Sequence, residues 1–270
     1  MRSALALIRA NFLTAASYRL AWIMSVAGLA FQIVPTYYIG KTLDPYLGSA
    51  IKGEGSNYFG FLVMGTVGYL LLSAAVDSLP RALERGINTG TLELIFSTPS
   101  SVPSLLVGLT GYELLWATAR CLVVLGAAAV FGFHPHWLRF GQAAVILVLV
   151  IATYFGIGMI AGALIIAYRR TGQLQQAVIV GSAMLGGVMY PTKLVTQAVP
   201  QWVSRLSDVV PMTYGIRAVR RITIDDWPLR AVLADVGMLS MFCVAFLTLG
   251  SLAMTHALRR ARAEGTLSQY

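Results

Sequence analysis

The chain has 270 residues, of which 57% are hydrophobic and only 11% are charged, and its mean hydropathy is +0.72. About a quarter of the residues in a soluble domain are charged, so this composition excludes a water-soluble globule and indicates a multi-span membrane protein. The net charge of +9 favours contact with anionic membrane lipid, and no binding of nucleic acid is expected.

The N-terminal segment 1–19 predicts an amphipathic helix at the membrane interface. Leu5, Ile8 and Phe12 recur at three- and four-residue steps, whereas Arg9 falls outside this stripe. A simple topogenic anchor remains the alternative interpretation of the segment.

Membrane-spanning helices need about 20 mostly apolar residues. Six segments are candidates: Leu20–Gly40, Tyr58–Leu79, Leu105–Phe131, Phe140–Tyr168, Ala177–Tyr190 and Ala231–Leu258. The fifth is short for a full crossing unless the residues from Thr171 onward are included. The predicted fold is an all-α polytopic membrane protein, with residues 1–270 forming a single transmembrane domain.

The arginines predict the orientation of these spans. They precede the first span, follow the second and the fourth, and recur in the tail 259–270, whereas the alternate short connections carry few unbalanced positive charges. We therefore expect both termini and the connection 80–101 to face the cytoplasm.

The segment 191–229 is expected on the outer side, although it is rich in Lys and Arg. Its apolar residues recur at helical spacing, which Pro200 and Pro211 interrupt. Two short amphipathic helices that lie on the outer face, or dip into it as a re-entrant hairpin, fit this pattern.

Two charged residues, Glu113 and Arg120, fall inside the third predicted span. They are seven residues apart, so they share one helix face. A charge near the bilayer centre costs several kcal/mol and usually faces protein or water, so each residue either lines a polar path or pairs with another span. Asp77 and Asp235 lie at span ends, where we expect solvation at the interface.

No motif in the sequence supports catalysis. The Gly-x-x-x-x-Gly-Lys-Ser/Thr phosphate loop and the usual hydrolase and metalloprotease motifs are absent, so we predict that the chain is not an enzyme. His134 and His136 flank a proline without a third nearby ligand, which favours a short turn over a metal site. Gly158 and Gly162 predict close packing between helices.

Two stretches of the chain resemble a known family. RALERGINTGTLELIFSTPSSVPSLLVG, Arg81–Gly108, resembles the signature connection of permeases of the type-2 ATP-binding-cassette (ABC) exporter family. Gly186–Arg220 resembles that family's second signature, in which Tyr-Pro ends the fifth span and Pro-x-Thr-Tyr runs into Ala-x-Arg. The two stretches occur in the expected order, and the resemblance covers essentially the whole chain.

The resemblance implies a transmembrane subunit that forms a dimer, either with a second copy or with a close paralogue. Two copies of an ABC ATPase would dock on its cytoplasmic face and bind ATP and Mg, so this chain would bind no cofactor and no metal. The implied ATPase-coupling residues are Thr91, Leu92, Glu93, Leu94, Arg169 and Arg170. Gly90, Thr91 and Pro99 independently favour a short capped helix, in whose first turn Glu93 could act only as a capping charge.

The predicted function is export of an amphiphilic or lipid-like substrate from the cytoplasm or the inner leaflet of a bacterial inner membrane. The predicted substrate path contains Tyr69, Glu113, Arg120 and Tyr154, with an outer gate at Tyr190 and Pro191. The alternative is an ATP-independent secondary transporter or channel that uses Glu113 and Arg120. The substrate's identity stays open.

The chain departs from the family pattern at two positions. Leu109 stands where a lysine is frequent, and Arg217 stands where a glutamate often precedes the Ala-x-Arg. Arg217 could favour anionic groups at the exit, or it could reflect a swapped salt bridge.

Overall fold

The computed structural model describes residues 7–10, 12–13, 19–48, 50–51, 55, 57–91, 102–168, 172–191 and 201–263. Every regular element in these ranges is a helix, so the all-α prediction is confirmed for them. The elements are α2 (Arg19–Leu47), α3 (Tyr58–Asn88), α5 (Val102–Val130), η1 (Trp137–Arg139), α6 (Phe140–Tyr168), α7 (Gly172–Leu185), α9 (Gln201–Val209), α10 (Pro211–Thr223), η2 (Leu229–Val232) and α11 (Leu233–Ala263).

Within the described ranges, five helical segments are long and apolar enough to cross a membrane. They are Ile23–Leu47, Tyr58–Asn88, Ser104–Val130, Phe140–Tyr168 and Leu229–Ala261. These segments correspond to the first four predicted spans and the sixth. The protein is therefore a helical, multi-pass membrane protein, as the composition indicated.

The fifth predicted span, within the described residues, does not form a helix long enough to cross a membrane. α7 has 14 residues, which at 1.5 Å per residue give about 21 Å, against a hydrocarbon core of about 30 Å. The helix ends here because Gly187 adopts a φ of +68°, a left-handed conformation that glycine adopts more readily than other residues. The N–H of Val188 then donates to the carbonyl of Ala183 at 3.1 Å and closes the helix end. A full crossing at this point stays a prediction.

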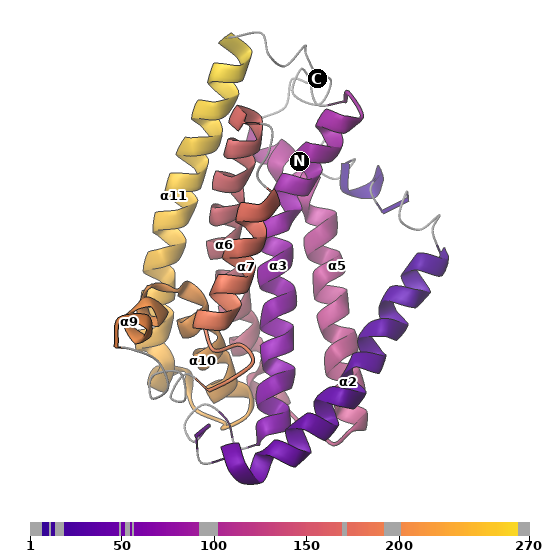
Figure 1. Ribbon diagram of the computed structural model, residues 1–270, viewed down its shortest axis with the longest axis vertical. Helices are drawn as coiled ribbons and strands as arrows, with labels where there is room; N and C mark the ends of the chain where they lie inside the picture. The colour runs from indigo at the N-terminus through magenta and orange to yellow at the C-terminus, as the bar shows by residue number, and fades with distance from the viewer. Residues whose placement is uncertain are drawn as a thin grey trace.

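α3 lies at the centre of the bundle, where it contacts α2, α5, α6, α7 and α10 (Figure 1). α6 and α11 pack along each other on one side of it. Small residues permit these close approaches, as predicted. A Cβ added to Gly158 would lie 2.8 Å from the carbonyl oxygen of Ala75 on α3, and one added to Gly162 would lie 3.0 Å from Leu83 Cδ1.

Figure 1 shows α2 diverging from the bundle toward its N-terminal end. Its apolar side chains there are exposed, for example Leu20 at 69% and Ile23 at 63%. Nearer its C-terminus, the ring of Tyr37 packs on Phe59 with ring centroids 5.3 Å apart. An apolar exposed surface of this kind suits contact with lipid or with another membrane helix.

Two short helices precede α11, as the segment 191–229 predicted. α9 ends at Val209, and α10 begins with Pro211 in its first turn, where the missing N–H of proline costs nothing. α10 does not lie on the surface: it is largely buried and contacts α3, α6, α7 and α11. Pro200 lies outside the described residues, and the position of this hairpin relative to a membrane stays a prediction.

The N-terminal segment contacts α5 where it is described. Residues 7–10 and 12–13 are helical, and the rings of Phe12 and Tyr112 meet edge to face with centroids 6.5 Å apart. Ile8 lies against Gly111, where an added Cβ would be 2.7 Å from Ile8 Cδ1. Ile8 and Phe12 of the predicted stripe therefore contact α5, while the placement of the segment at a membrane interface stays a prediction.

Candidate functional site: a charged cleft between three helices

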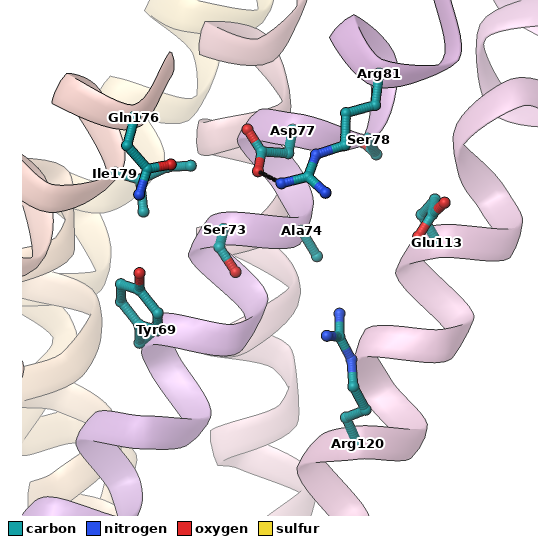
Figure 2. A pocket seen from close by; sticks show the side chains of 10 residues that line it. All are labelled: Tyr69, Ser73, Ala74, Asp77, Ser78, Arg81, Glu113, Arg120, Gln176 and Ile179. Carbon is teal, nitrogen blue, oxygen red and sulfur yellow. Dashed lines mark hydrogen bonds and ion pairs between the residues drawn. The ribbon is translucent and has the colours of Figure 1, made fainter. Parts of the chain in front are cut away.

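A polar cleft of about 240 Å³ opens between α3, α5 and α7 (Figure 2). It is lined by Tyr69, Ser73, Ala74, Asp77, Ser78, Arg81, Glu113, Arg120, Gln176 and Ile179. The first six come from α3, the next two from α5 and the last two from α7.

Helical periodicity explains why α3 lines the cleft. Tyr69, Ser73, Asp77 and Arg81 follow one another at four-residue steps, so they form one stripe along the helix. Residues on other faces of α3, such as Leu72, are buried in the apolar core. The core therefore fixes the polar stripe in place.

Ion pairs compensate most of the charge in this cleft. Arg81 Nη2 donates to Asp77 Oδ2 at 2.6 Å within α3. Arg85 Nη2 donates to Glu113 Oε1 at 3.1 Å and so links α3 to α5. Arg120 makes no such pair with any residue that the structure describes.

The structure brings together three of the four residues predicted for a substrate path. Tyr69, Glu113 and Arg120 all line the cleft. Tyr154 does not, because its side chain is fully buried and its hydroxyl accepts the backbone N–H of Met212 at 3.2 Å. Tyr154 therefore anchors the first turn of α10, and its place on the predicted path receives no geometric support.

The residues predicted for an outer gate lie just beyond the end of α7. The hydroxyl of Tyr190 donates to the carbonyl of Met184 at 2.6 Å, and Pro191 is buried. The neighbouring carbonyl of Met189 accepts a hydrogen bond from the hydroxyl of Tyr58, at the start of α3. This segment therefore lies at the opposite end of α3 from its last residue, Asn88.

Sequence reasoning missed Arg220, the largest fully buried side chain among the described residues. Its guanidinium donates to the carbonyls of Gly187 at 2.8 Å, Val188 at 2.6 Å and Phe61 at 3.1 Å. It also lies 3.4 Å above the centre of the Phe61 ring. Arg220 therefore joins α10 to α3 and to the turn after α7. The one sequence feature that could have identified Arg220 is its position as the arginine of the Ala-x-Arg signature.

The predicted solvation of Asp235 is wrong. Its side chain is only 7% exposed, because α10 packs over the start of α11 and brings Arg217 and Arg221 to it. Arg217 donates to both carboxylate oxygens, and Arg221 Nη1 donates to Oδ2 at 3.0 Å. Of the two explanations for the departure at Arg217, the structure therefore favours the salt bridge.

The end of α3 has the geometry that its sequence predicted. Gly90 adopts a φ of +66°, its N–H donates to the carbonyl of Ile87, and that of Thr91 donates to the carbonyl of Gly86 at 2.9 Å. These bonds close the helix in a Schellman motif. The predicted coupling residues Leu92, Glu93, Leu94, Arg169 and Arg170 lie outside the described residues.

The two histidines of the sequence FHPHW lie in an irregular segment between α5 and η1. The backbone N–H of His136 donates to the carbonyl of Thr223 at 3.0 Å, which ties the segment to the end of α10. Within the described ranges, no group of three or more potential metal ligands forms. Nearby, burial raises the pKa of Asp225 above its usual value, although Arg221 and His136 oppose this rise.

The long apolar helices, two of which border a charged cleft together with α7, define a multi-pass membrane protein. The ABC-2 type transporter family model matches residues 3–224, so the chain belongs to that family, as its two signature stretches predicted. Nodulation protein J from Rhizobium leguminosarum bv. viciae is 23% identical over 245 residues, which cover 89% of this chain and 89% of that protein. The chain is a membrane transport permease of an ABC exporter. Membership also implies an ABC ATPase subunit as a partner.

Proposed function

We propose that this chain exports an amphiphilic or lipid-like substrate, with two ATPase subunits docked on its cytoplasmic face. The single observation that carries the proposal is the cleft itself, a polar, charged cavity inside an otherwise apolar bundle of a transport permease. A substrate with both polar and apolar parts would match these two environments. The permease would act as a dimer, with a second copy or a close paralogue, because two ATPase subunits need two docking sites.

The proposed drive for transport is ATP bound with Mg on the partner subunits. The connection after α3 would contact the ATPase through Thr91, Leu92, Glu93 and Leu94, and the connection after α6 would contact it through Arg169 and Arg170. These contacts would transmit the conformational change of the ATPase to the membrane helices. The Schellman motif at Gly90 supports this idea, since it defines a fixed direction for the chain as it leaves α3.

Both ends of the chain are proposed to face the cytoplasm of a bacterial inner membrane. The arginine bias of the connections supports this orientation. It would place the end of α3 near the ATPase, with the cleft between the ATPase-facing end and the Tyr190–Pro191 segment. In this arrangement the Tyr190–Pro191 segment would be the outer gate.

The alternative of ATP-independent transport through Glu113 and Arg120 receives less support. Family membership favours an ATP-driven exporter. Glu113 is also already engaged in an ion pair with Arg85, at 3.1 Å.

Mutation of Glu93 tests the proposed coupling. The chain and its ATPase are co-expressed and co-purified in lipid, and both the bound ATPase and the rate of ATP hydrolysis are measured. Glu93→Ala should lower one or both by about tenfold, the loss expected for a charged contact at an interface. Glu84→Ala, the same substitution within α3, is the matched control and should change neither. If Glu93→Ala binds and couples like the unmodified chain, the coupling role of Glu93 is refuted.

A further inference from the structure

We propose that the cleft binds a phosphate group of the transported substrate, with Arg120 as the residue that anchors it. This inference rests on the proposed function, since it takes the ligand of the cleft to be the exported amphiphile. It narrows the substrate class from an amphiphile in general to one that carries a phosphate.

The charge balance of the cleft gives the first argument. Four of its lining residues carry a charge at neutral pH: Asp77, Arg81, Glu113 and Arg120. Asp77 is neutralised by Arg81 at 2.6 Å, and Glu113 is neutralised by Arg85 at 3.1 Å. Arg120 is the one remaining lining cation, and among the described residues it has no carboxylate partner. A cation held inside an apolar bundle is costly unless an anion joins it, so the cleft is suited to one negative group.

Unused hydrogen-bond donors give the second argument. Ser78 Oγ and Arg120 Nε are both buried, both belong to residues that line the cleft, and neither has a hydrogen-bond partner in the described part of the chain. The Ser78 residue is only 2% exposed. Buried donors without acceptors are rare in native proteins and point to a ligand or to water that would complete them.

The chemistry of the donors favours a phosphate. The guanidinium of arginine presents a planar fork of N–H groups that matches two phosphate oxygens. The hydroxyls of Tyr69 and Ser78 and the amide of Gln176 supply neutral donors around the same space. Figure 2 shows Arg120 and Glu113 on α5, across the cleft from Tyr69 and Gln176. The cavity of about 240 Å³ greatly exceeds the ~30 Å³ that one water molecule occupies, so a polar headgroup fits.

Binding of dodecyl phosphate tests the proposal directly. The full chain is placed in phosphatidylcholine nanodiscs, and retention of radiolabelled dodecyl phosphate is measured above that of empty nanodiscs. Arg120→Gln should weaken binding by about tenfold or more, because it removes the charged donor that would hold the phosphate. Ser78→Ala should weaken it by a few-fold, and Arg120→Lys should retain part of the affinity, since it keeps the charge but loses the fork.

Arg139→Gln is the matched control, because it changes the net charge by the same amount. Arg139 pairs with Asp226 at 2.7 Å, and neither residue lines the cleft. This control should bind dodecyl phosphate within about twofold of the unmodified chain, as expected for a partly exposed pair away from the site. Thermal midpoints of all variants show whether each remains folded, and Ser78→Ala with Arg120→Lys carries the test if Arg120→Gln does not fold.

Competition with inorganic phosphate separates the two sources of the group. If inorganic phosphate displaces the label as well as unlabelled dodecyl phosphate does, the site binds a soluble phosphate, which contradicts an amphiphilic ligand. If inorganic phosphate displaces the label only weakly, the result supports a phosphate carried on a lipid-like chain. The proposal is overturned if Arg120→Gln binds dodecyl phosphate like the unmodified chain, or if Arg139→Gln weakens that binding as much as Arg120→Gln does. It is also overturned if the chain retains no dodecyl phosphate, because water alone then fills the cleft. This assay contains no ATPase, so its failure would leave the proposed coupling to the partner intact.

Discussion

Replacing Asp235 by asparagine removes the charge that holds α10 to the start of α11 while keeping the shape of the side chain. Asp235 accepts hydrogen bonds from two arginines, Arg217 and Arg221, and its side chain is only 7% exposed. Breaking a buried ion pair by removal of one partner costs about 3–5 kcal/mol. The arginine side chains are 28% and 23% exposed, so they can regain water, and we expect the lower value of about 3 kcal/mol.

The loss is measured as the thermal midpoint of the purified chain in detergent. One kcal/mol shifts the midpoint of a chain near this size by about 2–4 °C, so Asp235→Asn should lower it by about 6–12 °C. Asp226→Asn provides the matched control: its side chain is 47% exposed and pairs with Arg139. An exposed pair contributes about 0–1 kcal/mol, so this variant should lose no more than about 4 °C. Equal midpoints for the two variants would refute the buried pair and restore interfacial solvation of Asp235.

Two further predictions concern packing and pH. Gly158→Leu should lower the thermal midpoint by several degrees, because the added Cβ would meet two backbone oxygens of α3 at 2.8 and 2.9 Å. Overpacking of this kind costs about 1–3 kcal/mol. Gly126→Leu is the control: its Cβ meets nothing within 4 Å among the described atoms, so this variant should leave the midpoint nearly unchanged. Burial raises the pKa of Asp225 in the folded chain above its usual value of 3.8, so ionisation destabilises the fold as the pH rises through that folded pKa. Asp225→Asn should therefore raise the midpoint at pH 7 and leave it unchanged below the usual pKa, where the carboxyl is neutral in both states; a raised midpoint at both pH values would contradict the linkage.

Local features of the chain could be predicted from the sequence because their causes are local. Five of the six predicted spans match long helices over most of their length, since an apolar run of sufficient length nearly determines a spanning helix. The turn at Gly90 was predictable for the same reason, because a glycine after a helix favours the left-handed conformation that closes it. Glu113 and Arg120 were found together by their spacing on a single helix.

Features that depend on distant partners could not be predicted. The carbonyls that hold Arg220 lie 32, 33 and 159 residues away in the sequence. Asp235 was misassigned because its burial depends on α10 folding back into the bundle. Tyr154 looked like a path residue because it is polar within an apolar run, but its hydroxyl is satisfied by Met212, 58 residues later. Sequence spacing carries no information about such contacts until the helices are packed.

The composition of the purified complex tests the central claim most directly. The chain is co-expressed with its candidate ATPase, purified in lipid, and the mass and ATP hydrolysis of the particle are measured. We expect a particle with two permease chains and two ATPase subunits, whose hydrolysis is lost when the phosphate-loop lysine of the ATPase is replaced. A permease that purifies without any ATPase, and transports substrate in its absence, would contradict the claim.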